Sequence, residues 1–185
     1  MSPIEPVNMP LSDFLAWNAG TGGGHELIEG EVVPIAPVSE THGLLVSRLT
    51  IRIGMRARPP CQMFAEAGIV IPERNTFFVA DLVMSCVERQ GEAPVIDEPL
   101  LVVEVLSRAS AALDRGIKLY HYIAVPSVRE VLFVDGRRRG GQVWHRDGEG
   151  WRMETVEGCG SIHLETTDDT IPLAPIYGSL DLSSN

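Results

Sequence analysis

Three strongly apolar runs, at residues 62–71, 77–87 and 100–106, constrain the fold of this 185-residue chain more than any other feature. Each run is bounded by Gly, Pro or charged residues, as expected of strands that lie in a core. Helical and strand-like segments alternate irregularly around them, so the pattern predicts an α/β or α+β fold rather than a regular βαβ repeat. No internal repeat or linker-like stretch is visible, and we expect a single domain over residues 1–185.

The segments around these runs predict further elements. Residues 9–17 have the spacing of a short helix, and residues 39–58 and 111–124 have that of two longer helices. Residues 25–35 alternate between apolar and polar side chains in two arms, which indicates a hairpin. The chain after residue 131 resembles a meander of short strands.

The second and third apolar runs each carry one acid set among apolar residues. Asp81 interrupts the run at 77–87, and Glu104 interrupts the run at 100–106. Burying an ionised carboxylate without a partner is costly, so proteins pair it, protonate it or bind a metal. For one such acid, a solvent-facing position or a structural ion pair with arginine is the simpler explanation, but two acids in consecutive runs favour a shared cation.

Lys118 is the only lysine beside fourteen arginines. Strand residues rise by ~3.3 Å and helical residues by ~1.5 Å, so the Lys118 ammonium can return along a helix to the level of Glu104. Asp114, Lys118 and Tyr122 are four residues apart and share a face of the expected helix. An ordinary solvated face with an Asp–Lys pair is the alternative interpretation.

The formal net charge of -10 argues against a non-specific nucleic-acid binder, because clustered cations provide the attraction to phosphate. The acidity is concentrated at the two ends of the sequence. Residues 1–39 sum to -5 and residues 147–185 to -7, whereas residues 40–146 sum to +2. The central segment can therefore still form one positive face.

Two groups of arginines lie in the central segment. Arg48, Arg52 and Arg56 are four residues apart and share one face of the helix expected at 39–58. Residues 137–139 are all arginine and lie in a polar turn, where a solvated hairpin tip is a simpler account than a phosphate contact.

Cys61, Cys86 and Cys159 have no C-x-x-C spacing, which indicates neither a disulfide framework nor a zinc site. A reducing cytoplasm is therefore the expected location. No segment approaches the ~20 apolar residues that a membrane-spanning helix needs, and no signal-peptide pattern is visible. We expect a soluble cytoplasmic protein without a membrane partner.

A series of short motifs resembles the bacterial Uma-type endonuclease family of the PD-(D/E)XK, or restriction-endonuclease-like, superfamily. The resemblance runs from about residue 11 to residue 180. Its motifs are, in chain order, Glu26-Leu27-Ile28-Glu29-Gly30-Glu31, His42, Ala80-Asp81-Leu82, Val102-Val103-Glu104-Val105-Leu106-Ser107, Asp114-x-x-x-Lys118-x-x-x-Tyr122 and Val134-Asp135. No single motif is specific, and the order and spacing together carry the resemblance.

The resemblance implies a central mixed β-sheet flanked by helices, with additional short C-terminal strands. It implies that Asp81, Glu104 and the main-chain carbonyl near Val105 hold Mg²⁺ or Mn²⁺. Lys118 takes the place of the catalytic lysine of the superfamily, and Glu26 is the fourth catalytic residue. These expectations amount to a metal-dependent endonuclease that hydrolyses phosphodiester bonds in DNA.

The sequence departs from the superfamily pattern at two positions. Ala80 stands where the Pro-Asp pair has proline, and Leu106 stands two residues after Glu104, so the lysine must come from the helix. His42 could be a helix-start residue, a core histidine or a site member, and structural roles are favoured. A homodimer would suit cleavage of both strands, by analogy with the superfamily. The alternative function is a non-catalytic binding or assembly module that keeps the nuclease fold.

Overall fold

The computed structural model describes residues 8–20, 24–88, 95–107, 114–180 and 182. Its strands are β1 (His25–Ile28), β2 (Glu31–Pro34), β3 (Gln62–Ile71), β4 (Thr76–Ser85), β5 (Pro99–Leu106), β6 (Glu130–Asp135), β7 (Gly140–Asp147), β8 (Gly150–Glu157), β9 (Ser161–Leu164) and β10 (Asp169–Pro172). Its α-helices are α1 (Leu11–Gly20), α2 (Glu40–Gly54), α4 (Leu119–Tyr122) and α5 (Leu173–Tyr177). A 3₁₀ turn, η1 (Pro72–Arg74), and a π-helical turn, η2 (Asp114–Lys118), complete the described elements.

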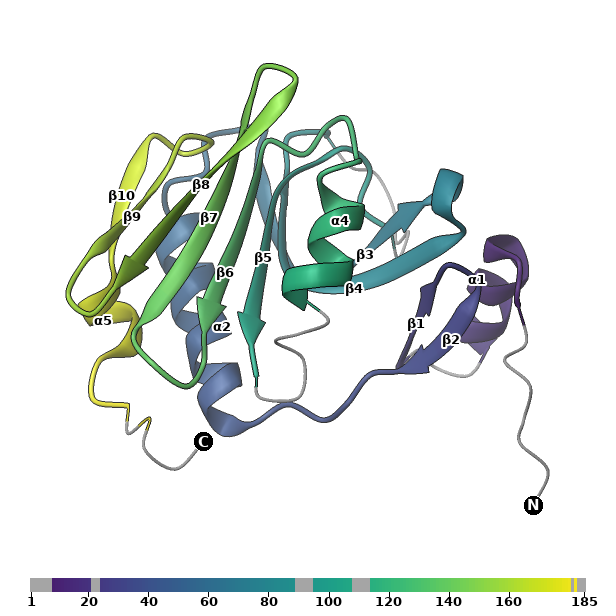
Figure 1. Ribbon diagram of the computed structural model, residues 1–185, viewed down its shortest axis with the longest axis horizontal. Coiled ribbons are helices and arrows are strands. Elements are labelled where there is room, and N and C mark those ends of the chain that lie inside the picture. The colour runs from purple at the N-terminus through teal and green to yellow at the C-terminus, as the bar shows by residue number, and fades with distance from the viewer. Residues whose placement is uncertain (1–7, 21–23, 89–94, 108–113, 181, 183–185) are drawn as a thin grey trace.

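A large mixed sheet forms the centre of the molecule (Figure 1). Its strands follow the order β2-β1-β4-β5-β6-β7-β8, β3 pairs with β4, and β9 and β10 form a separate two-stranded sheet. Strands β5 and β6 are parallel, and the other neighbouring pairs are antiparallel. The predicted mixed sheet flanked by helices, with short C-terminal strands, is confirmed.

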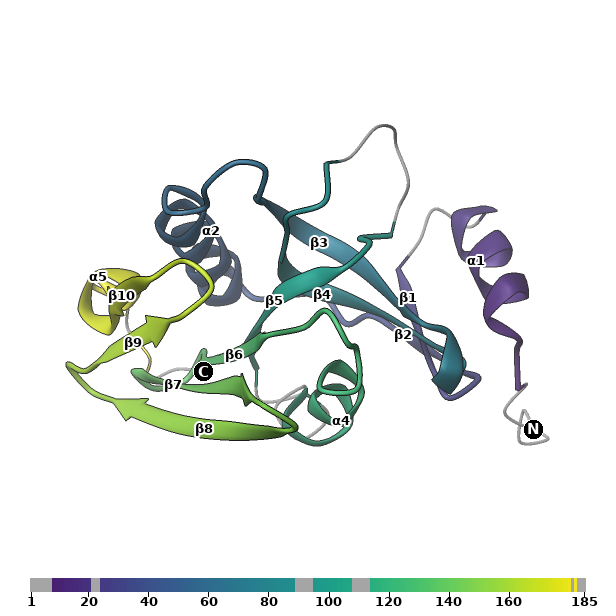
Figure 2. The same ribbon diagram turned by 90° about the horizontal axis from the view of Figure 1, so that it is seen from above.

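Helices cover both faces of β5 (Figure 2). Side chains alternate across a strand, so Val103 faces the core cluster that contains α2, and Val102 faces the cluster that contains Tyr122 of α4. Because both faces are covered, β5 has an almost continuous apolar sequence in which Glu104 is the exception.

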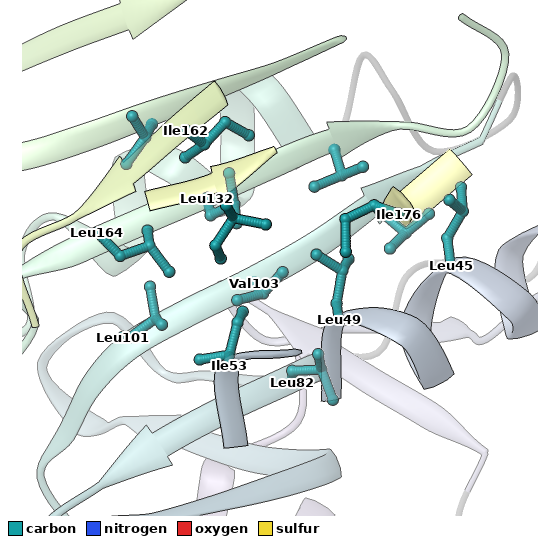
Figure 3. Close-up of a cluster of buried hydrophobic side chains, with 14 of the residues drawn as sticks. Leu45, Leu49, Ile53, Leu82, Leu101, Val103, Leu132, Ile162, Leu164 and Ile176 are labelled. Atoms are coloured by element: carbon teal, nitrogen blue, oxygen red, sulfur yellow. The ribbon is translucent and has the colours of Figure 1, made fainter. Parts of the chain in front are cut away.

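Helix α2 packs one apolar stripe against the sheet (Figure 3). Leu45, Leu49 and Ile53 are four residues apart and at most 1% exposed, and they lie against Val103 of β5 and Leu132 of β6. Each such side chain contributes roughly 1.5–3 kcal/mol by its burial. This packing anchors α2, so that its first turn lies beside the C-terminal end of β5.

The helix predicted over residues 111–124 is not a regular α-helix in its described part. A π-helical turn over Asp114–Lys118 leads directly into the single α-helical turn of α4. Residues 111–113 lie outside the described part of the chain. π-Helical turns are rare and occur often at functional sites.

The arginine stripe of α2 has a structural role. Arg48 Nη1 donates to the carbonyl oxygens of Ile176 at 2.9 Å and Tyr177 at 2.7 Å. Arg52 Nη2 lies 3.1 Å from Asp169 Oδ2. These contacts hold α5 and β10 against α2.

The expectation that the cysteines form no disulfide is also wrong. Cys61 and Cys86 are joined in a disulfide, whereas Cys159 is free and exposed. Pairing of Gln62 with Ser85 places the two cysteines at the next opposed position of the antiparallel strands. Spacing along the sequence could not reveal this register. The disulfide removes one support for a reducing cytoplasm, and the cytoplasmic location stays a prediction.

Among the residues that the structure describes, no helix is both long and apolar enough to cross a bilayer.

Candidate active site

Lys118 lies between two carboxylates inside the protein. Its Nζ is 3.0 Å from Glu26 Oε1 and 3.2 Å from Glu104 Oε1, and its side chain is only 8% exposed. The ring of Phe78 lies on another side of the ammonium, with its centroid 5.5 Å from Nζ. Lysine is almost never buried unless it is paired. The interpretation of Lys118 as part of a solvated helix face is therefore wrong.

Glu104 receives a second donor from the same helical segment. The Tyr122 hydroxyl donates to Glu104 Oε1 at 2.6 Å, so Lys118 and Tyr122 converge on one carboxylate oxygen. Both Glu104 and Tyr122 are buried. A short hydrogen bond from a hydroxyl to an ionised carboxylate is a strong one, and it restricts how the Glu104 side chain can turn. The four-residue spacing of Lys118 and Tyr122 was the signal in the sequence.

The β1–β2 hairpin brings Glu26 to this group. Strand β1 pairs with β4 through Leu27 and Phe77, and Glu26 Oε1 accepts a hydrogen bond from the Val79 amide at 3.0 Å. The same oxygen contacts Lys118. The Lys118 cluster, as we name it, therefore consists of Glu26, Glu104, Lys118 and Tyr122.

Asp81 lies where the pairing of β4 with β5 ends. The last pair on this side is Leu82 with Val103, so Asp81 is one step beyond it, across from Glu104. Asp81 Oδ2 accepts a hydrogen bond from the Val105 amide at 2.6 Å. The Asp81 carboxylate is thereby fixed beside the peptide that joins Glu104 to Val105.

His42 contacts the other oxygen of Asp81. Its Nε2 lies 3.0 Å from Asp81 Oδ1, and the two side chains are 13% and 19% exposed. Ser39 caps α2 by accepting a hydrogen bond from the His42 amide at 3.2 Å, which fixes His42 in the first turn. The sequence left the role of His42 open, because the contact depends on how α2 packs against the sheet.

The donor set suits a hard divalent cation. Glu26, Asp81 and Glu104 with Lys118 carry a formal charge of -2, which one divalent ion would balance. Mg²⁺ prefers oxygen ligands, and the two carboxylates on β4 and β5 with the Val105 carbonyl are oxygens. Among the described residues, no group of three or more His, Cys, Asp or Glu side chains is arranged to hold a metal. A site here would therefore rest on two carboxylates and main-chain oxygen.

Comparisons with known proteins give the same class of fold. A protein from Anabaena variabilis, described as "a putative nuclease belonging to DUF820", superposes with a TM-score of 0.72 at 15% identity, over 91% of this chain and 97% of its own. Two uncharacterized Synechocystis proteins are similar in sequence. One, slr1290, is 24% identical over 97% of each chain, and the other, sll1609, is 29% identical over 60% of this chain and 65% of its own.

The family model Uma2, described as "Putative restriction endonuclease", matches residues 11–177, and the chain belongs to this restriction-endonuclease-like family.

Proposed function

We propose that this chain is a divalent-metal-dependent endonuclease that hydrolyses phosphodiester bonds of DNA, acting as one domain over residues 1–185. The family description and the name of the structural neighbour support the nuclease class. The observation that carries the proposal is the position of Asp81 beside the Glu104–Val105 peptide, next to a buried lysine.

Asp81, Glu104 and the Val105 carbonyl would hold Mg²⁺ or Mn²⁺. Such an ion, when bound, polarises the phosphoryl group and lowers the pKa of a coordinated water. His42 and Tyr122 would orient the two carboxylates, because each contacts one carboxylate oxygen. Buried ion pairs can often be replaced by apolar residues without loss of stability, so their presence in a core favours a functional role.

The Lys118 ammonium would hold the attacking water or neutralise the charge that develops on the phosphoryl oxygens. Glu26 and Glu104 keep the ammonium in one position, and Phe78 restricts it from another side. A donor that is already oriented stabilises developing charge without the reorganisation that water would need. The functional unit is therefore the ammonium together with its carboxylate partners.

Cleavage of labelled duplex and single-stranded DNA under Mg²⁺ or Mn²⁺ tests the proposal. Asp81→Asn should lower the cleavage rate about 10³-fold, because loss of a metal ligand removes several kcal/mol of transition-state stabilisation. Asp147→Asn is the matched control, since Asp147 is an exposed acid at the far end of β7. Equal rates for wild type and Asp81→Asn would contradict the assignment.

A non-catalytic binding or assembly module is the second candidate. The net charge of -10 favours it, because an acidic surface repels DNA. Thermal melting separates the two, since an ion that binds the native protein raises the melting temperature by mass action. No Mg²⁺ or Mn²⁺ response, together with no cleavage, would make the module the better account. Cleavage of both strands by a homodimer stays a prediction.

A further inference from the structure

A second charged group lies at the C-terminal end of β6, where Asp135 contacts three arginines. Asp135 is 2% exposed, and its Oδ2 lies 3.2 Å from Arg115 Nη2 and 3.3 Å from Arg138 Nε. Its Oδ1 accepts a hydrogen bond from the Arg137 amide at 2.9 Å and lies 3.5 Å from Arg137 Nε. One buried carboxylate therefore orients three guanidinium groups.

Burial alone would raise the pKa of the Asp135 carboxyl, but the Arg137 amide and the surrounding guanidinium groups outweigh burial and lower its pKa. The carboxylate is therefore ionised at neutral pH and remains a fixed anchor. Without Asp135, the arginines would repel one another and spread into solvent.

The arginines exceed the acids that contact them. Each guanidinium has five N–H donors, and one carboxylate can accept about four hydrogen bonds. Among the described side chains, the second acid in contact is Glu157, 3.3 Å from Arg138 Nη1. Arg139 donates to the Gly178 carbonyl, which is uncharged. Among the described side chains, these four arginines and two acids sum to a formal +2, in a protein whose net charge is -10.

This positive surface adjoins the candidate active site. Asp135 pairs with Leu106, two residues after Glu104, and the Gly136 amide donates to the Leu106 carbonyl at 2.9 Å. Arg115 lies in the same π-helical turn as Lys118. The arrows of β5 and β6 point to the same edge of the sheet in Figure 1. The arginines and the carboxylates of the site thus occupy one end of the sheet.

The three arginine side chains are exposed enough to contact a ligand that approaches from solvent. The side chains of Arg115, Arg137 and Arg138 are 35%, 36% and 64% exposed, so each guanidinium reaches the surface while Asp135 holds it from below. Side chains that are ordered before binding lose less entropy on binding. Planar guanidinium groups match the paired oxygens of a phosphate.

We propose that Arg115, Arg137 and Arg138 form a binding site for the backbone phosphates of DNA that enters the candidate active site. This assignment rests on the proposed function. Their charge attracts the polyanion to one edge of a protein whose net charge is -10, and concentrates it at the place where the chemistry would occur.

Salt-dependent binding of a fluorescent 20-bp DNA duplex to the full chain, measured without a divalent metal, tests this site. The double variant Arg115→Gln/Arg137→Gln should bind about tenfold more weakly at ~0.1 M salt, and the slope of log K against log salt should decrease by nearly 2. The control Arg56→Gln/Arg129→Gln has the same charge change, two residues after α2 and one residue before β6, and should behave like wild type.

The variant Arg115→Lys/Arg137→Lys retains the charges that balance Asp135 and should retain most of the salt slope, which separates phosphate contact from loss of folding. A wild-type slope in the glutamine variant, or an equal loss in the control, would overturn the site. So would wild-type protein that does not bind the duplex. If binding depends on these arginines but no DNA is cleaved, the phosphate site stands and the proposed nuclease function is wrong. If the glutamine variant cleaves DNA as fast as wild type, the nuclease function stands and the phosphate site is wrong.

Discussion

Two buried carboxylates on neighbouring strands, Glu104 and Glu130, are held in different ways. Glu130 Oε1 and Oε2 accept hydrogen bonds from the main-chain amides of Glu165 at 2.7 Å and Thr166 at 2.8 Å. His145 Nδ1 lies 2.8 Å from Glu130 Oε1. Glu104 Oε1 contacts two side chains, Lys118 and Tyr122, from a helical segment on one face of the sheet.

The positions of the two acids differ as well. Glu130 begins β6 and is tied to the turn after β9, far along the strand from Asp135. Glu104 lies near the C-terminal end of β5, beside the partly exposed Asp81. Glu130 connects the start of β6 to the turn after β9, whereas Glu104 lies beside a second carboxylate and a buried lysine. Position in the sheet and neighbouring charges therefore distinguish the structural acid from the candidate catalytic acid.

The largest effect on stability is expected at Glu130. Glu130→Gln removes the charge that two amides and His145 share, and it should lower the free energy of unfolding by about 3 kcal/mol. Urea denaturation measures the loss, and Glu154→Gln on the exposed face of β8 is the control. Cleavage per folded molecule should equal that of wild type. A stable Glu130→Gln protein without cleavage would contradict a structural role for Glu130.

Tyr177 provides a second test of how much a buried side chain that is hydrogen-bonded to the main chain contributes to stability. Its hydroxyl lies 2.6 Å from the Asp135 carbonyl and 2.8 Å from the Gly140 carbonyl, and burial raises its pKa to about 12. An unfolded tyrosine loses its proton near pH 10, so the unfolded state binds fewer protons between pH 10 and 12 and stability falls as pH rises. At pH 9 this stabilisation is fully present.

Tyr177→Phe removes the titrating group. We expect the difference in unfolding free energy between wild type and Tyr177→Phe to decrease by about 1 kcal/mol from pH 9 to pH 11. Urea denaturation of both proteins at the two pH values measures it. A difference that is the same at both pH values would show that the Tyr177 hydroxyl titrates as in the unfolded chain.

A modest effect on cleavage is expected at Tyr122, which contacts Glu104 through its side chain. Tyr122→Phe removes one donor from Glu104 while Lys118 remains, so DNA cleavage should decrease about tenfold. Tyr120→Phe is the control, because Tyr120 is 56% exposed. A variant that loses stability but retains the full cleavage rate would place Tyr122 with the structural groups.

Much of the candidate site could be predicted from sequence because its acids break an apolar pattern. Asp81 and Glu104 are conspicuous for that reason. Lys118 is a candidate catalytic residue from the sequence alone, because it is the only lysine. Glu26 came from the family resemblance, since an acid in an ordinary hairpin has no distinguishing pattern. Glu130 gave no signal, because an acid at the start of a strand usually faces solvent.

Contacts that depend on register or packing could not be predicted. His42 meets Asp81 only because α2 lies against the sheet. The disulfide between Cys61 and Cys86 requires the antiparallel pairing of β3 with β4. Arg115 of η2 meets Asp135 at the end of β6. In each case the two partners are separated by at least twenty residues in the sequence.

The most direct test of the account is the location of bound Mn²⁺ in crystals of the full chain, from an anomalous difference map. We expect a peak in contact with the carboxylates of Asp81 and Glu104 and with the Val105 carbonyl, beside Lys118. The peak should be absent in Asp81→Asn crystals prepared in the same way. Wild-type crystals in which Mn²⁺ binds elsewhere, with no peak between Asp81 and Glu104, would contradict the account.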